Sequence, residues 1–168
     1  MTGGSTSPSA RNCPRNGSTS DPDTRPPAFI VHSLAHVVAA LTEAARANRP
    51  IVVASAPNAG IYAGAGWFGA LVAAARAAVP QACFVAWLDC GDDAGAAQAA
   101  IRAGVEGIVF TGRADVAARL ADIAAQAGIK LTTQPPAATL DLAGLFVADA
   151  ETLRRRIADT LASCAGIC

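Results

Sequence analysis

Short apolar runs alternate along the chain with longer stretches in which apolar residues recur every three or four positions. Runs rich in β-branched residues are typical of buried strands, and the longer spacing is typical of amphipathic helices. We expect five strands, at 28–33, 51–56, 83–89, 107–112 and 129–134. We expect helices at 34–49, 67–79, 92–104, 114–128 and 151–164, and a short apolar run at 145–150 before the last of them.

The regular alternation of strand and helix with short connections predicts an α/β fold, with a mostly parallel five-stranded sheet and flanking helices. A complete barrel of eight strand–helix units needs more than about 200 residues, and the chain has 168. Two architectures fit this length: an open doubly wound sheet and a partial TIM-type barrel.

The first 27 residues differ sharply from the rest, because they consist mainly of Ser, Thr, Gly, Pro and Asn. Such a segment buries too little apolar surface to offset the entropy lost on ordering. The predicted organisation is a disordered N-terminal tail at 1–27 and a single α/β domain at 28–168.

Composition and charge limit the classes of partner and the cellular location that we expect. Thirteen basic residues balance thirteen acidic ones, which gives no electrostatic basis for binding nucleic acid or an anionic membrane. No apolar run reaches the roughly 18 residues that span a bilayer, and no secretory signal opens the chain. We therefore expect a cytoplasmic protein. Only 15% of residues are charged and alanine is abundant, which favours a homo-oligomer or a protein partner.

The five cysteines have irregular spacing, so we expect free thiols, no disulfide framework and no cysteine-based zinc site. No cofactor is expected.

Residues 64–69 spell G-x-G-x-x-G, and Asp89 follows twenty residues after the last glycine. A dinucleotide fingerprint works because its glycines follow the strand directly and bring a helix N-terminus onto the pyrophosphate. Here residues 57–63 intervene, so we interpret the fingerprint as accidental. Nucleotide or dinucleotide binding through Gly64–Gly69 stays an alternative.

Three motifs follow one another in a recognisable order: Tyr62-Ala63-Gly64, Leu88-Asp89-Cys90-Gly91, and Ala100-Ile101-Arg102-Ala103-Gly104 with a strand after it. Because of this order of motifs, residues 28–134 resemble the central part of class II fructose-bisphosphate aldolases. The chain resembles a truncated and degenerate member of that family. The chain is also similar to a group of short alanine-rich bacterial proteins that share Ser-Ala-Pro, Tyr-Ala-Gly-x-Gly-Trp and Leu-Asp-Cys.

The aldolase resemblance implies a proton-donating role for Asp89. It also exposes departures, because the family's metal-binding His after that Asp is Cys90 here, and no His follows His36 to match the family's later ligands. The resemblance therefore implies the scaffold and one carboxylate.

The candidate site residues lie mostly at strand ends, where α/β proteins place their ligands. We expect Asp89 and Cys90 to be catalytic if the chain is an enzyme; alternatively Asp89 caps the next helix and Cys90 fills space. His32, His36 and Cys90 are weak candidates for a metal site. The expected ligand-binding residues are Ser55, Asn58, Tyr62, Gly64, Gly66 and Thr111, although Trp67 and Phe68 could instead anchor their helix to the core.

Three functions are compatible with these residues. The favoured one is a non-catalytic aldolase-like domain that binds a small ligand or assembles with itself or a partner. The second is a reduced aldolase-like lyase using Asp89, and the third is the nucleotide binder. Whether the chain is an enzyme stays open, with a non-enzyme favoured.

Overall fold

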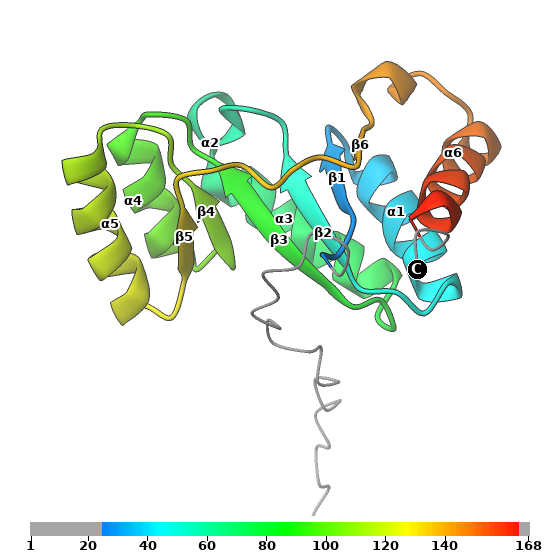
Figure 1. Ribbon diagram of the computed structural model, residues 1–168, viewed down its shortest axis with the longest axis horizontal. Helices are drawn as coiled ribbons and strands as arrows, with labels where there is room; N and C mark the ends of the chain where they lie inside the picture. The colour runs from blue at the N-terminus through cyan, green and yellow to red at the C-terminus, as the bar shows by residue number, and fades with distance from the viewer. Residues whose placement is uncertain (1–24, 165–168) are drawn as a thin grey trace, which may run out of the picture.

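The computed structural model describes residues 25–164, which form an α/β fold with a six-stranded sheet (Figure 1). The strands are β1 (Ala28–Val31), β2 (Ile51–Ser55), β3 (Phe84–Asp89), β4 (Gly107–Val109), β5 (Lys130–Thr132) and β6 (Leu140–Asp141). The helices are α1 (Leu34–Arg46), α2 (Ala59–Tyr62), α3 (Gly64–Ala78), α4 (Ala94–Ala103), α5 (Ala114–Gln126), the 3₁₀ turn η2 (Ala143–Leu145) and α6 (Ala150–Ser163). The predicted tail at 1–27 falls almost wholly outside the described residues.

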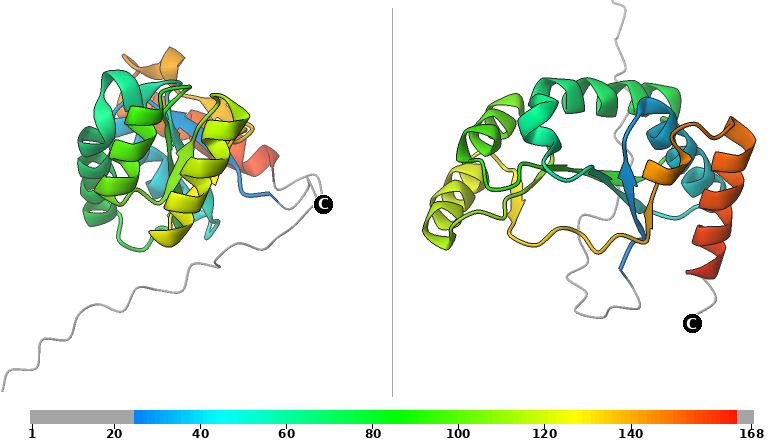
Figure 2. Two further views of the ribbon diagram at one scale, coloured as in Figure 1. Left: turned by 90° about the vertical axis from the view of Figure 1, so that its left-hand side faces the viewer. Right: turned by 90° about the horizontal axis from the view of Figure 1, so that it is seen from above.

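Every strand pair in the sheet is parallel, and the order is β5-β4-β3-β2-β1-β6. The first five strands are therefore laid side by side in chain order, and β6 returns to pair with β1. Seen from above, the helices form an arc along one side of the sheet, and the connection from β5 to β6 crosses the opposite side (Figure 2). Parallel α/β sheets of the doubly wound kind carry helices on both faces. Of the two architectures that the sequence allowed, the partial barrel is the one observed.

Side-chain burial along β3 shows the same asymmetry between the two faces of the sheet. Phe84, Ala86 and Leu88 are buried under the helices, whereas Val85, Trp87 and Asp89 alternate with them and are only half-buried. Successive side chains on a strand point to opposite faces. The face that no described helix covers, which we call the open face, therefore carries Trp87 and Asp89.

The hydrophobic core lies between the sheet and the helices. Phe29, Leu88 and Ile108 from the strands meet Leu41 and Phe68 from α1 and α3, and all five are at most 2% exposed. Burial of each such side chain contributes about 1.5–3 kcal/mol. Phe68 thus anchors α3 to the core as anticipated, whereas its neighbour Trp67 is 40% exposed.

The helices begin and end at residues whose chemistry suits those positions. The Asp93 side chain accepts a hydrogen bond of 2.8 Å from the Ala96 amide at the start of α4, and Gly104 ends that helix in the left-handed conformation. The sequence suggested Asp89 as an alternative cap for α4. That interpretation is wrong, because Asp93 fills the position.

The structure departs from the predicted elements in two places. A sixth strand, β6, was not expected. The apolar run at 145–150, for which no element was predicted, begins at the end of η2, and Phe146 and Val147 in it are exposed. The loop before the glycine sequence contains the short helix α2, so that α3 begins at Gly64.

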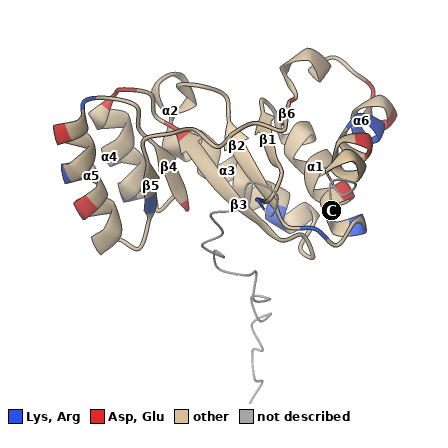
Figure 3. Cartoon of the chain, in the orientation of Figure 1, with Lys and Arg blue, Asp and Glu red and all other residues tan. Residues whose placement is uncertain are grey.

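Charged residues gather mainly on the helices at the two ends of the sheet, α5 and α6 (Figure 3). Glu43 is 8% exposed and lies between α1 and α6. Its carboxylate accepts hydrogen bonds from Arg154 on α6, at 2.8 Å, and from Arg46, at 3.1 Å. Arg154 thus has a structural role as the partner of Glu43.

Among the described residues, no helix is both long and apolar enough to cross a membrane. Cys83 is disulfide-bonded, so the expectation of free thiols throughout is wrong at that position.

Candidate functional site: a pocket at the carboxyl ends of the strands

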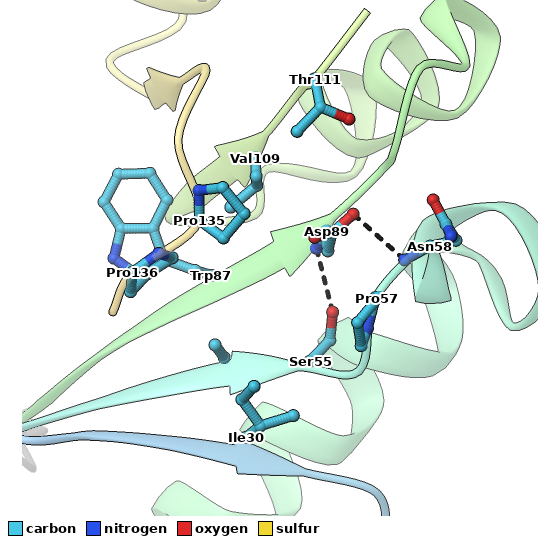
Figure 4. A pocket seen from close by; sticks show the side chains of 11 residues that line it. Ile30, Ser55, Pro57, Asn58, Trp87, Asp89, Val109, Thr111, Pro135 and Pro136 are labelled. Carbon is cyan, nitrogen blue, oxygen red and sulfur yellow. Dashed lines mark hydrogen bonds between the residues drawn. The ribbon is translucent and has the colours of Figure 1, made fainter. Parts of the chain in front are cut away.

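A pocket of about 270 Å³ lies on the open face of the sheet, at the carboxyl ends of the central strands (Figure 4). Its polar lining residues are Ser55, Asn58, Asp89 and Thr111, which follow or end β2, β3 and β4. Its apolar walls come from Ile30, Ala54, Pro57, Trp87, Val109, Pro135 and Pro136. Open α/β sheets and barrels place their ligands at this edge.

The Asp89 carboxylate is held in place by two backbone amides. Its Oδ1 accepts hydrogen bonds from the amide of Gly91, at 2.8 Å, and from the amide of Asn58, at 3.1 Å (Figure 4). Within the described part of the chain, Oδ2 has no hydrogen-bond partner. One oxygen therefore fixes the side chain and the other stays available to a ligand.

Ser55 positions the backbone of Asp89 through a hydrogen bond. Its hydroxyl oxygen accepts a hydrogen bond of 2.9 Å from the Asp89 amide, and the hydroxyl donates to the Ala56 carbonyl at 3.0 Å. The side chain is buried, and both its donor and one acceptor position are used. Ser55 is therefore a positioning residue that ties the end of β2 to the end of β3.

Trp87 forms a wall of the pocket because a glycine lies beside it. Trp87 on β3 pairs in register with Gly107 on β4, and a Cβ atom at Gly107 would come within 2.6 Å of the indole ring. The absence of a side chain at Gly107 lets the ring lie over this residue of β4 on the open face. On its other side, Trp87 pairs in register with Ala54 of β2, and this small side chain leaves the space beside the ring unfilled.

Asn58 and Thr111 complete the polar rim. Asn58 has a left-handed backbone (φ 61°), and its side-chain oxygen rests where a Cβ of Gly91 would lie, only 2.1 Å from that point. The Thr111 amide donates to the Gly91 carbonyl at 2.7 Å, which joins the loops after β3 and β4. Gly91, itself at φ 55°, is thus the residue on which both loops converge.

Cys90 lies next to Asp89 in sequence but outside the lining of the pocket. Its side chain is fully buried, and a Cβ on Gly60 of α2 would lie 2.7 Å from its sulfur. Burial raises the pKa of the Cys90 thiol to about 12, and the nearby Asp89 and Asp93 carboxylates act in the same direction. A buried, protonated thiol is a poor nucleophile and a poor metal ligand.

Three predicted ligand-binding residues of the glycine sequence lie away from the pocket. Tyr62 ends α2 and is 67% exposed, and Gly64 and Gly66 belong to the first turn of α3. None of the three lines the pocket. Because α2 lies between the end of β2 and Gly64, the glycines do not follow a strand, and the geometry of a dinucleotide fingerprint is lacking.

His32 and His36 are engaged with each other and with β6. The His32 ring nitrogen Nε2 lies 2.7 Å from the Asp141 carboxylate, and the His32 amide donates to Nδ1 of His36 at 3.2 Å. His36 is buried, and burial lowers its pKa below the ordinary value although the Leu145 carbonyl opposes this. Burial alone would raise the pKa of Asp141, but hydrogen bonds from the Ala143 amide and His32 together outweigh it and lower the pKa of that carboxyl.

The class II aldolase resemblance implies a metal, and the residues present do not fit one. His32 and His36 face β6, whereas the Cys90 sulfur is buried against α2. Across residues 25–164, no three His, Cys, Asp or Glu side chains come close enough together to hold a metal ion. The described residues therefore supply no ligand set for the metal that the resemblance implies.

The sequence analysis predicted the polar residues of this site from their positions at strand ends, but it did not predict the apolar walls. Ile30, Trp87 and Val109 looked like ordinary strand residues, and their exposure follows only from the lack of helices on the open face. Pro135 and Pro136 reach the pocket because the β5–β6 connection crosses the sheet, which no local pattern reveals. Gly107, opposite Trp87, was the one available signal, because glycine within a strand often marks a close approach.

Fold and pocket together define an α/β domain of partial-barrel form with a ligand pocket at its carboxyl edge. No protein-family model and no curated protein matches the sequence. Among solved structures, one assigned as a fructose-1,6-biphosphate aldolase from Coccidioides immitis matches with a TM-score of 0.54 and 19% identity, over 65% of this chain and 40% of that one. A second, assigned as a tagatose 6-phosphate kinase from Sinorhizobium meliloti, matches with a TM-score of 0.46 and 18% identity, over 84% of this chain and 46% of that one.

The first of these similarities shows that this chain has an aldolase-like fold, as the order of its sequence motifs predicted. In both cases the chain spans less than half the length of the solved protein.

Proposed function

We propose that this chain is an aldolase-like domain that binds a small polar molecule in the pocket above Trp87, without cleaving it. The single observation that carries the proposal is the Asp89 carboxylate, fixed through Oδ1 by two amides and left with Oδ2 free beside an apolar wall. Small-molecule sites combine apolar walls with a few well-placed polar groups in this way. The volume of about 270 Å³ suits a compact metabolite.

The chain contains two tryptophans, which makes a selective binding test possible. In a Trp67→Phe protein, the emission of Trp87 reports on the pocket. We expect glycerol, dihydroxyacetone or ethanolamine to change this emission saturably, with dissociation constants in the millimolar range that is typical of ligands this small. The matched control is Trp87→Phe, in which the remaining Trp67 lies outside the pocket and should not respond. If no probe gives a saturable change in the first protein, the binding function is refuted.

The alternative of a reduced lyase keeps one observation in its favour, namely that Asp89 lies where the resemblance implies a proton donor. A metal must polarise the substrate carbonyl in such a reaction, and the candidate ligands are scattered across the described residues. We expect the purified protein to cleave no fructose 1,6-bisphosphate in a coupled assay and to carry no stoichiometric metal. One zinc per chain by elemental analysis, lost in Cys90→Ala, would make the lyase the leading hypothesis.

A further inference from the structure

Among the described residues that line the pocket, Asp89 is the only one with a formal charge. None of these described lining residues is Lys, Arg or His. A pocket that binds a phosphorylated molecule ordinarily supplies cationic side chains or free helix amides to balance the charge. The lining therefore disfavours an anion by composition alone.

The residues of the rim, outside the lining of the pocket, are also mainly acidic. The loop after β3 adds Asp92 and Asp93, whereas the Arg113 guanidinium of the next loop donates two hydrogen bonds to the Asp115 carboxylate, at 3.0 and 3.1 Å. His32 is likewise turned to Asp141. The described rim thus has no cation without a carboxylate partner.

Helix N-termini at the same edge would attract an anion, but acidic residues offset the two nearest the loops after β3 and β4. Asp93 caps α4, and Asp115 lies in the first turn of α5. A carboxylate at such a position uses the free amides and the positive end of the helix dipole. The dipoles therefore leave the acidic character of the pocket in place.

The two central groups of the pocket are arranged for a cation. Trp87 and Asp89 are two residues apart on β3, so both side chains project from the open face. The indole lies over Gly107 and lines the pocket, while Oδ2 of Asp89 has no partner among the described residues. An ammonium group could donate a charge-assisted hydrogen bond to Oδ2 while the apolar part of the same ligand lies against the ring.

From this arrangement we infer that the pocket takes a small protonated organic amine, whose ammonium group pairs with Asp89 and whose apolar body lies against Trp87. The inference rests on the proposed binding function and names its ligand class.

The test compares three compounds that share one four-carbon body and differ in the head group: butylamine, 1-butanol and butyl phosphate. Binding is measured at pH 7 through Trp87 emission in the Trp67→Phe protein. We expect butylamine to bind about tenfold more tightly than 1-butanol, and butyl phosphate to give no saturable change. Asp89→Asn retains an oxygen for the two amides but loses the charge, so it should reduce the amine preference to less than twofold. Asp122→Asn, which removes an exposed carboxylate on α5 outside both the lining and the rim, should leave the preference within twofold of its original value.

Each other outcome refutes the inference in a recognisable way. Equal binding of 1-butanol and butylamine keeps the binding pocket and overturns the amine. Tighter binding of butyl phosphate does the same and points to an anion site. An amine preference that survives Asp89→Asn places the cation elsewhere. No response to any of the three, nor to the neutral probes above, overturns the binding function together with the amine.

Discussion

Asp89 and Cys90 are neighbours in the chain and have opposite surroundings. Strand alternation turns Asp89 toward the open face and Cys90 toward α2, where Gly60 allows a helix backbone to rest on its sulfur. The sequence identified both residues through their place at the end of an apolar run. Which of the two reaches a ligand depends on the face that the helices cover, and the run itself does not contain that information.

Burial of Cys90 predicts a thiol that resists alkylation. A rise of its pKa from 9.0 to about 12 lowers the thiolate fraction at pH 8 about a thousandfold, because each pKa unit is a factor of ten. In native protein treated with iodoacetamide at pH 8, peptide mass spectrometry should find Cys164 labelled and Cys90 unlabelled. Labelling of Cys90 as fast as Cys164 would contradict the buried position.

The same raised pKa makes stability depend on alkaline pH. The folded thiol ionises at a higher pH than the unfolded one, so its contribution is complete below about pH 9 and is lost as the pH rises toward 12. In urea denaturation at pH 8 and pH 10.5, we expect the free energy of unfolding of the wild type to fall more between the two pH values than that of Cys90→Ala. Parallel declines in the two proteins would show that Cys90 ionises normally.

Gly91 supports the rim in two ways, through its left-handed backbone and through the space that its missing side chain leaves for Asn58. Gly128 shares only the first of these properties, so a comparison of the two glycines separates their effects on stability. Both have a positive φ, 55° and 72°, but a Cβ at Gly91 meets Asn58 whereas one at Gly128 meets nothing within 4 Å. We expect Gly128→Ala to cost about 1 kcal/mol of stability from strain alone, and Gly91→Ala about 2–4 kcal/mol. Chemical denaturation measures both. Equal losses would mean that Asn58 moves aside freely.

At the scale of elements, α6 is attached to the rest of the fold by packing and by an ion pair to a buried carboxylate. Leu153, Ile157 and Leu161 are buried along it, and Arg154 donates to the Glu43 carboxylate on α1. Arg154→Ala should lower the free energy of unfolding in urea, because it leaves the buried carboxylate with one partner fewer. The neighbouring Arg155, changed to Ala, is the matched control and should have an effect several times smaller. Two equal effects would argue against the ion pair.

Elements with long apolar runs or clear helical spacing were predicted well from the sequence. All five expected strands and the helices between them exist, since neighbouring residues decide them. β6 was missed because two residues, Leu140 and Asp141, form a strand only through their pairing with Phe29 and Ile30. No strand was predicted for the apolar run at 145–150, and in the structure Phe146 of this run packs edge-on against the His36 ring.

At the scale of the whole molecule, the assembly state stays a prediction. Among the described strands, β5 and β6 form the edges of the sheet, and α3 exposes Trp67 among many alanines. Such surfaces are commonly covered by a second chain. Light scattering at micromolar concentration should give a mass above the 16.8 kDa of one chain, and Trp67→Lys should lower it more than Ile123→Lys on α5. A mass of 16.8 kDa for the unmodified protein would refute the prediction.

The return of β6 to β1 also implies an order of events during folding. Strands β1 to β5 each pair with the next strand along the chain, so this part forms from contacts that are close in sequence. The bond between the Ala28 amide and the Thr139 hydroxyl joins residues 111 positions apart. Contacts across such distances form slowly, because a long loop must close first. The five-stranded unit can therefore assemble while the ribosome is still adding residues, and β6 and α6 dock last. A ribosome stalled soon after residue 132 would thus carry a nascent chain whose first β-strand still lacks one of its two neighbours.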